Sequence, residues 1–200
     1  MEIFWHGHSC FTIKSKEATI VTDPFKMGET LPPLKADIVT LCGEGEIAEV
    51  AGSPRVLDWP GEFEVAGVSI ESFHPNGDET NAFLFQVEGI HICHLGYLSH
   101  EISDEVLDRI GDVDILLIPV GGGLVLDGKT AQKVVESIEP RVVIPMVYGA
   151  TKTKLQIGGA EEFLKAVGKS ELVPVEKYSI SGRASLPEGT MEFVLLEPKL

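Results

Sequence analysis

The sequence lacks three features that would assign it quickly to a functional class. It has no apolar run approaching the ~20 residues of a membrane-spanning helix. It also lacks an excess of basic residues: there are 16 lysines and arginines against 31 aspartates and glutamates, and the formal net charge is −15 at pH 7. Such an acidic surface disfavours binding to the phosphate backbone of nucleic acids and to anionic lipids. We therefore expect neither a nucleic-acid partner nor a membrane.

Cysteine is scarce as well. Cys10, Cys42 and Cys93 are the only cysteines, and no two of them have the CxxC spacing of a metal or redox motif. All three lie in or beside apolar segments, which indicates buried free thiols in a reducing compartment. The first residues show neither the basic segment nor the apolar segment of a signal peptide. We expect a cytoplasmic protein.

Apolar residues make up 44% of the 200 residues. This content suits one globular domain of ordinary size with a full hydrophobic core. We predict a single domain over residues 1–200 that needs neither a disulfide nor a structural metal for stability.

The two halves of the chain differ in their hydrophobic patterns. In the first half we predict strands at Glu2–Trp5, Cys10–Ile13, Ala18–Thr22, Ile38–Leu41, Arg55–Leu57, Glu62–Val65, Val68–Phe73, Ala82–Val87 and Ile90–His94. In the second half we predict helices at Glu101–Ile110, Gly128–Ile138 and Gly159–Val167, and strands at Asp114–Val120, Arg141–Met146, Leu172–Val175 and Glu192–Leu196. This order predicts an α/β (mixed α+β) fold with mixed sheets covered by helices.

One stretch is of special interest for function. The predicted buried strand Ile38–Leu41 leads into the loop Cys42–Glu46, and a helical turn is predicted at Ile47–Val50. In open α/β sheets, sites form just beyond the carboxyl ends of strands. We therefore expect any metal site to lie at this loop.

Seven segments, in this order and spacing, resemble the small Zn-dependent hydrolases of the metallo-β-lactamase superfamily, in its lactamase-B-like branch. They are Trp5–Phe11, Asp23–Phe25, Lys35–Val39, Pro60–Val65, His94–Gly96, Pro119–Gly122 and Ile144–Tyr148. The resemblance implies a four-layer αβ/βα sandwich, with two mixed sheets face to face and helices on both outer faces. It also implies one or two metal ions, held by imidazoles and carboxylates, that activate a bound water.

The family supplies its metal ligands from an HxHxDH run, from a histidine after a later strand, and from HLGD and IPMHY runs. Most of these ligand positions hold other residues here, at Gly43, Gly45, Ala48, Tyr97 and Val147. Only His74 is left of the ligand set that the resemblance implies. We therefore predict a degenerate metal site without a cofactor. The chain would be a non-catalytic pseudoenzyme that binds a small molecule or a protein at the vacated cleft, or acts as a scaffold.

A few residues near this cleft stay as candidates. His74, His8 and Asp23 are weak metal-ligand candidates, because a role as a turn histidine is favoured for His74 and structural hydrogen bonds are favoured for His8 and Asp23. Tyr97 is predicted to fill the vacated volume and to donate its hydroxyl to His74 or Asp23, with Val147 beside it. His94 and His100, which flank Tyr97, are interpreted as partly buried histidines with backbone partners.

The alternative is a hydrolase of the esterase or phosphodiesterase type, and the sequence leaves open whether the chain is an enzyme. Its site would be rebuilt around one Zn or Mn ion, or would work without metal. The candidate catalytic residues are His74, Tyr97, Glu44 and Glu46, and the Cys42 thiol and His8 could add ligands. An active site completed by a second chain is a third option.

Residues 123–130 match the phosphate-binding pattern G-x-x-x-x-G-K-[ST], between a predicted strand and a predicted helix. The variable positions hold bulky Leu124, Val125 and Leu126, whereas a phosphate nest favours small residues. No second acidic strand for Mg²⁺ accompanies the motif. We therefore do not expect nucleotide binding.

Overall fold

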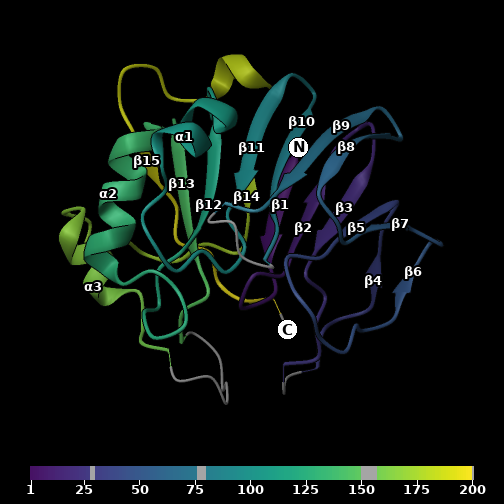
Figure 1. Ribbon diagram of the computed structural model, residues 1–200, viewed down its shortest axis with the longest axis horizontal. Helices are drawn as coiled ribbons and strands as arrows, with labels where there is room; N and C mark the ends of the chain where they lie inside the picture. Colours follow the sequence, from purple (N-terminus) through teal and green to yellow (C-terminus); the bar gives the residue numbers. More distant parts are fainter. Residues whose placement is uncertain (28–29, 76–79, 150–156, 200) are drawn as a thin grey trace.

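Two mixed β-sheets pack face to face in the computed structural model, which describes residues 1–27, 30–75, 80–149 and 157–199 (Figure 1). The first sheet has the strand order β14-β1-β2-β3-β5-β7. These strands are β1 (Glu2–Trp5), β2 (Phe11–Lys14), β3 (Thr19–Thr22), β5 (Ile38–Thr40), β7 (Arg55–Leu57) and β14 (Tyr178–Ser179). Because β3, β5 and β7 are parallel, their carboxyl ends meet at one edge of the sheet.

The second sheet has the order β15-β13-β12-β11-β10-β9-β8. Its strands are β8 (Gly61–Val65), β9 (Val68–Phe73), β10 (Ala82–Val87), β11 (Ile90–His94), β12 (Ile115–Pro119), β13 (Val142–Met146) and β15 (Glu192–Phe193). Strands β8 to β11 form an antiparallel meander, and β11, β12, β13 and β15 are parallel. Every residue of β12 and β13 is buried, as their continuous apolar runs predict.

Three α-helices lie beside the second sheet: α1 (Asp104–Ile110), α2 (Gly128–Ile138) and α3 (Glu161–Ala166) (Figure 1). A 3₁₀ turn, η1, covers Arg183–Ser185. The side chains of Ser103 and Asp127 cap α1 and α2 by accepting hydrogen bonds from backbone N–H groups of the first turn. None of the described helices has the length and apolar character needed to cross a bilayer.

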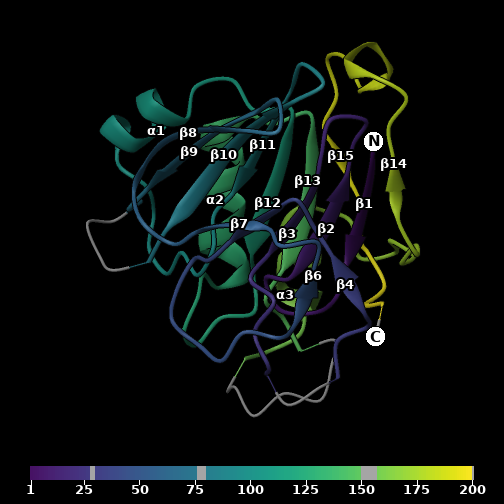
Figure 2. The same ribbon diagram turned by 90° about the vertical axis from the view of Figure 1, so that its right-hand side faces the viewer.

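The outer face of the first sheet is covered by a different kind of layer in the described chain. The short sheet of β4 (Leu34–Lys35) and β6 (Val50–Ala51) lies there, and Figure 2 looks onto this side. Leu34 joins Val21 and Val39 in a small second core beneath it. The main core fills the space between the two sheets, because alternate strand residues such as Ile3 and Trp5 point inward.

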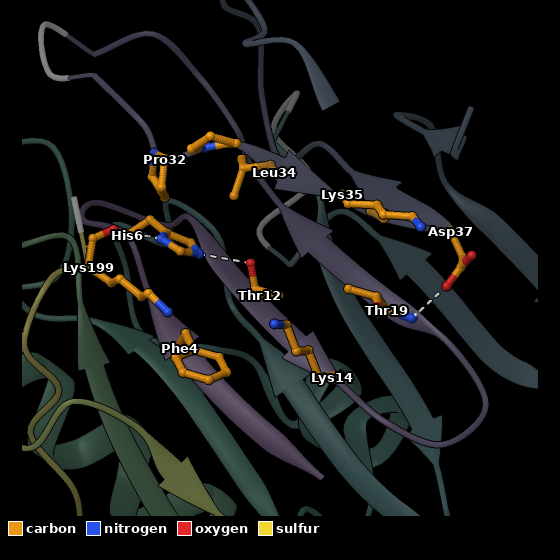
Figure 3. A pocket seen from close by; sticks show the side chains of 12 residues that line it. Phe4, His6, Thr12, Lys14, Thr19, Pro32, Leu34, Lys35, Asp37 and Lys199 are labelled. Carbon is orange, nitrogen blue, oxygen red and sulfur yellow. Dashed lines mark hydrogen bonds between the residues drawn. The ribbon is translucent and has the colours of Figure 1, made fainter. Parts of the chain in front are cut away.

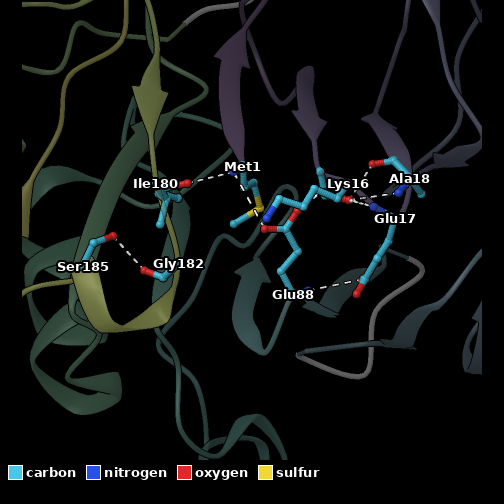
Figure 4. Close-up of polar contacts among 9 residues, drawn as sticks. Met1, Lys16, Glu17, Ala18, Glu88, Ile180, Gly182 and Ser185 are labelled. Carbon is cyan, nitrogen blue, oxygen red and sulfur yellow. Dashed lines mark hydrogen bonds and ion pairs between the residues drawn. The ribbon is translucent and has the colours of Figure 1, made fainter.

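The turns at one end of the sandwich are tied together by hydrogen bonds (Figure 4). In the β2–β3 turn, the Lys16 N–H donates to Glu88 Oε1 at 2.6 Å, and the Glu88 N–H donates to Glu17 Oε2 at 3.3 Å. The nitrogen of Met1 donates to the Ile180 carbonyl at 2.8 Å. These contacts lie at the start of β11 and of β3. The carboxyl ends of both strands therefore lie at the opposite end of the sandwich.

The mixed α/β architecture expected from the sequence is confirmed. Two local predictions are wrong. Ile47–Val50 is not helical, because Ile47 forms a β-bridge with Phe25 and Val50 begins β6. Leu172–Val175 is not a strand; Val173 is 75% exposed, and the strand that pairs with β1 is β14 instead. In both places, pairing with segments distant in the chain determines the backbone conformation, and the local hydrophobic pattern does not.

Candidate metal centre

Three strands end beside one another with side chains that can bind a metal ion. Asp23 follows β3, Cys42 lies two residues beyond β5, and His94 ends β11. A carboxylate oxygen, the thiol sulfur and an imidazole nitrogen of these residues all lie within 4.8 Å of one another. All three side chains are buried, and no other group of three such residues occurs within the described ranges. We call Asp23, Cys42 and His94 the buried triad.

The imidazole of His94 is held in one orientation and one tautomer. Its Nε2 lies 3.0 Å from the Ser9 carbonyl oxygen, which can only accept, so Nε2 carries the proton. Its Nδ1 accepts from the Gly96 N–H at 3.2 Å and faces Cys42 Sγ at 3.3 Å. A histidine that ligates a metal commonly donates its other ring N–H to a backbone carbonyl in this way. The Nδ1 lone pair is thus aimed at the triad.

Asp23 supplies the oxygen donor. Its Oδ1 accepts a hydrogen bond from the Cys42 backbone N–H at 2.6 Å. Its Oδ2 is buried and has no hydrogen-bond partner within the described residues. A buried carboxylate oxygen left in this state is costly unless a proton or a cation satisfies it. An oxygen, a sulfur and a nitrogen donor around one point are a set that a zinc ion accepts.

Burial controls the charges of the triad. Burial raises the pKa of Asp23, against the opposing effects of the nearby His94 ring and the Cys42 N–H. Burial also raises the pKa of the Cys42 thiol, and the Asp23 carboxylate adds to that shift. Burial lowers the pKa of His94. Burial thus disfavours the charged form of each group, and a divalent ion would bring positive charge that favours ionised Asp23 and Cys42.

Close backbone packing brings the triad together. Gly96 has φ +56°, and a Cβ there would lie 2.5 Å from the Asn81 carbonyl and 2.9 Å from Cys42 Cβ. Asn81 in turn donates its backbone N–H to the Cys42 carbonyl at 2.8 Å, and its side-chain amide to the Leu41 carbonyl at 3.1 Å. Only glycine at position 96 allows β11 to approach Cys42 so closely.

Tyr97, which is partly buried, lies against the buried triad. Its side chain packs against both hydrophobic cores, and its hydroxyl is hydrogen-bonded to Ser9 Oγ at 2.8 Å. We call the Tyr97 side chain the cover of the triad. Ser9 therefore bonds two groups: its hydroxyl bonds the cover, and its carbonyl accepts the His94 ring N–H. The sequence predicted an inward Tyr97 that donates to His74 or Asp23, whereas in the structure the hydrogen-bond partner of its hydroxyl is Ser9. Burial raises the pKa of the Tyr97 hydroxyl, so it stays protonated.

Three of the seven described non-glycine residues with positive φ lie at this end of the sandwich. His8, Asp23 and Val147 have φ values of 49°, 42° and 50°, in the left-handed region that non-glycine residues rarely adopt. The strain is greatest for Val147, whose side chain is β-branched, and its N–H is held by the His8 carbonyl at 3.0 Å. Strained residues of this kind concentrate at functional sites.

The remaining candidates from the sequence lie outside the buried triad. His74 is partly buried, and its Nδ1 lies 3.1 Å from the Thr80 carbonyl. Glu44 and Glu46 are exposed, and Glu46 forms an ion pair with Lys26 at 2.5 Å. His8 is buried, and its carbonyl accepts hydrogen bonds from Trp5 and Val147. Of the candidates named from the sequence, the structure therefore brings Asp23 together with Cys42 and His94.

Aromatic side chains lie against two of the positions where the resemblance expects histidines. A Cβ on Gly45 would lie 2.7 Å from the Phe25 ring, and one on Gly43 would lie 4.0 Å from the Tyr97 ring. The ring of Phe25 therefore leaves no room for a larger side chain at Gly45 as the loop stands.

The segment 123–130 does not form a phosphate nest. The Asp127 carboxylate accepts the Thr130 N–H at 2.8 Å and so occupies the start of α2, where a phosphate would bind. Val125 and Leu126 are buried in the main core. These contacts agree with the expectation that the motif match is coincidental.

Sequence reasoning noted the Cys42 thiol and the Asp23 carboxylate but interpreted His94 as a structural residue. A signal was available: each of the three residues follows or ends a predicted strand, and strands in such sheets deliver their ends to a common edge. What the sequence could not supply is the placement of β11, in the second sheet, beside β3 and β5 of the first.

Comparison with known proteins identifies the relatives of this chain. A model of the beta-lactamase superfamily domain matches residues 2–147. A UPF0173 metal-dependent hydrolase of Thermococcus onnurineus is 32% identical, with 84% of this chain and 92% of the relative covered. A UPF0173 protein of Pyrococcus furiosus is 27% identical, covering 90% and 100%. The crystal structure of a candidate Zn-dependent hydrolase of the metallo-β-lactamase superfamily from Thermotoga maritima matches with TM-score 0.85 and 32% identity, covering 98% and 97%.

These similarities confirm the metallo-β-lactamase-like sandwich, and they correct the functional interpretation. The prediction of a non-catalytic pseudoenzyme with a degenerate metal site is wrong, since relatives across the chain's length are named metal-dependent hydrolases. The prediction relied on the ligands that are missing at the family's motif positions, and it did not combine Asp23 and Cys42 with His94, which the structure brings together. The names of the relatives also favour a metal cofactor over the expected absence of one.

Proposed function

Because this chain belongs to the metallo-β-lactamase superfamily, we propose that it is a metal-dependent hydrolase whose single metal ion is held by Asp23, Cys42 and His94. The observation that carries this proposal is the convergence of three different donor atoms within 4.8 Å. The fixed His94 tautomer and the unpartnered Asp23 Oδ2 support it, because both leave a donor aimed at the same point.

Zinc is the ion that this donor set favours. A thiolate is a soft ligand that suits zinc, whereas manganese prefers carboxylates, carbonyls and water. Three protein ligands also leave one position of a tetrahedral site for a water or a substrate, as in catalytic zinc sites. Bound there, zinc would polarise a substrate oxygen and lower the pKa of a water toward neutrality.

The chain's own residues prepare this chemistry. The Ser9 carbonyl holds the proton of His94 on Nε2, so Nδ1 is unprotonated, and a metal ion bound there would replace the long hydrogen bond that Nδ1 accepts from the Gly96 N–H. The Cys42 thiol must release its proton to act as a ligand, and burial, which raises the pKa of Cys42 and of Asp23, opposes the ionised form of both. The Tyr97 side chain, hydrogen-bonded to Ser9, covers the triad, and Gly43 lies next to this cover, since a Cβ there would lie 4.0 Å from the Tyr97 ring.

We infer that the substrate is an ester or a phosphodiester, the classes that the hydrolase reading of the sequence favours. A substrate would approach between Gly43 and Tyr97, and the Ser9–Tyr97 hydrogen bond would have to open or shift to admit it. Access to the buried triad would then depend on one side chain rather than on movement of a whole loop.

Hydrolysis of p-nitrophenyl acetate and of bis(p-nitrophenyl) phosphate tests the proposal. The zinc-loaded protein should hydrolyse one of them, and a chelator should abolish that activity. Cys42→Ala should lose it. Cys93→Ala is the matched control, because Cys93 is an equally buried thiol that lies outside the triad. Activity that survives both the chelator and Cys42→Ala would contradict the proposal, as would equal loss in Cys93→Ala.

A further inference from the structure

A cavity of about 480 Å³ opens on the outer face of the first sheet, away from the buried triad (Figure 3). Its floor is formed by outward-facing residues of β1 and β2, chiefly Phe4, Thr12 and Lys14. Pro32 and Pro33 form one wall, and Lys199 forms another. This volume is within the range of small-molecule sites.

Positive charge is concentrated at this cavity in a chain whose net charge is −15. The ammonium groups of Lys199 and Lys14 lie 4.5 and 5.2 Å from the centre of the Phe4 ring. Figure 3 shows the two side chains extending toward one another across that ring. A third ammonium, that of Lys177, lies 5.8 Å from the same ring. We call Phe4, Lys14 and Lys199 with their cavity the basic cavity.

The charges of Lys14 and Lys199 are not neutralised by ion pairs in the described part of the chain. Lys177 pairs with Glu2, which also lies within electrostatic reach of Lys14. Asp37 is the one acidic residue among the described residues that line the cavity, and its Oδ2 accepts the Thr19 N–H at 2.8 Å. Glu176 and Glu197 line an adjoining cavity instead. Within the described residues, two cations therefore converge without an ion-paired carboxylate.

The backbone around the cavity is fixed, which is a requirement for a binding site. The Lys199 N–H donates to the Trp5 carbonyl at 2.7 Å. His6 Nδ1 lies 2.8 Å from the Lys199 carbonyl, and because that oxygen only accepts, Nδ1 carries the proton. His6 Nε2 therefore accepts from the Thr12 hydroxyl at 2.8 Å. The backbone of Lys199 is thus anchored through both its N–H and its carbonyl. These two hydrogen bonds fix the point from which its side chain extends into the cavity.

We propose that the basic cavity binds a small phosphorylated molecule, with its phosphate monoester between Lys14 and Lys199. Two converging ammonium groups match a dianion, and a phosphate monoester carries a charge of about −1.5 to −2 at pH 7. The apolar part of the ligand would rest on Phe4 and against Pro32 and Pro33. The site is separate from the proposed hydrolytic centre, and its ligand is not required to be the substrate.

Titration with inorganic phosphate and with AMP, followed by calorimetry at constant ionic strength, tests this inference. A chelator is present, so that metal at the buried triad cannot bind phosphate. Lys14→Gln and Lys199→Gln should each weaken binding by about tenfold, the loss expected for one charge-assisted contact. Added salt should weaken binding by the wild-type protein, because the cavity is open to solvent.

Lys165→Gln is the matched control, since Lys165 is an exposed lysine on α3 and its loss changes the net charge equally. Binding by this variant and by Cys42→Ala should stay within about twofold of the wild type. Absence of saturable binding to both probes would overturn the inference. Equal weakening in Lys165→Gln would also overturn it, because binding would then follow net charge and not the cavity.

Discussion

Two histidines, His94 in the buried triad and His6 at the basic cavity, have the same kind of anchor but differ in what surrounds the second ring nitrogen. Each donates one ring N–H to a backbone carbonyl, of Ser9 and of Lys199. The second nitrogen of His6 accepts a hydrogen bond from the Thr12 hydroxyl at 2.8 Å. That of His94 accepts a longer one from the Gly96 N–H, at 3.2 Å, and also faces Cys42 Sγ, with Asp23 close by. A histidine is a ligand candidate only when its remaining lone pair points at other donors, whatever its place in a motif.

The two regions also differ in how they are built. The buried triad depends on backbone segments packed so closely that a single Cβ would separate them. The basic cavity is open, and long lysine side chains supply its charge. We therefore expect substitutions near the triad to change stability strongly and those near the cavity to change mainly binding and its dependence on solution conditions.

The largest effect is expected for Gly96→Ala. The new Cβ would meet the Asn81 carbonyl at 2.5 Å and Cys42 Cβ at 2.9 Å, in a left-handed backbone. We expect a loss of about 3 kcal/mol in the free energy of unfolding, measured by denaturant titration. Gly89→Ala is the matched control: Gly89 has φ +72° but no atom within 4 Å of a Cβ, so about 1 kcal/mol is expected. Equal losses would show that packing at the triad is loose.

A smaller effect is expected for Tyr97→Phe. The change removes the hydrogen bond with Ser9 Oγ but keeps the ring that covers the triad. The free energy of unfolding should fall by about 1 kcal/mol. The zinc-loaded variant should also lose its metal to a chelator faster than the wild type, because the cover is released. An unchanged rate of metal loss would mean that Tyr97 does not control access.

The smallest effect concerns His6 and pH. Burial lowers the pKa of His6 below its ordinary 6.5, although the Lys199 carbonyl opposes the shift. The unfolded chain therefore takes up this proton first as pH falls, so the folded state loses stability below pH 6.5 and is unaffected above it. The slope from this group cannot exceed about 1.4 kcal/mol per pH unit.

Unfolding of wild type and of His6→Gln, compared from about pH 7.5 to about pH 5, measures this contribution. The wild type should lose more stability over that range than the variant, which does not titrate. His100→Gln, a substitution of an exposed histidine, serves as the control and should follow the wild type. Parallel curves for wild type and His6→Gln would contradict the assignment of a neutral, doubly hydrogen-bonded His6.

Much of the fold could be predicted from the sequence because its signals are local. The apolar runs of β12 and β13 and the Asp127 cap of α2 appear in the structure where the pattern predicts them. The two-residue strands β4, β6 and β14 could not be predicted, since each exists only through a partner far away in the chain. The same reason explains Ile47, whose β-bridge with Phe25 replaces the predicted helical turn.

The candidate site was less predictable than the fold. Asp23 and Cys42 could be found because they lie close beyond predicted strands. His94 could not be recognised as a ligand candidate, because its role depends on which ring nitrogen the Ser9 carbonyl takes, a contact across 85 residues of chain. The basic cavity likewise depends on Lys199 returning to β1, which no local pattern predicts.

The most direct test of the buried triad is the zinc content of the protein, purified without a metal-affinity tag from cells grown with added zinc. We expect about one zinc ion per chain in the wild type and in His91→Gln, and almost none in His94→Gln. His91 and His94 lie on the same strand, but the His91 ring is hydrogen-bonded to the Asp112 carbonyl and lies outside the triad. A wild-type protein without metal, or a His94→Gln variant that keeps its zinc, would contradict the proposed metal site.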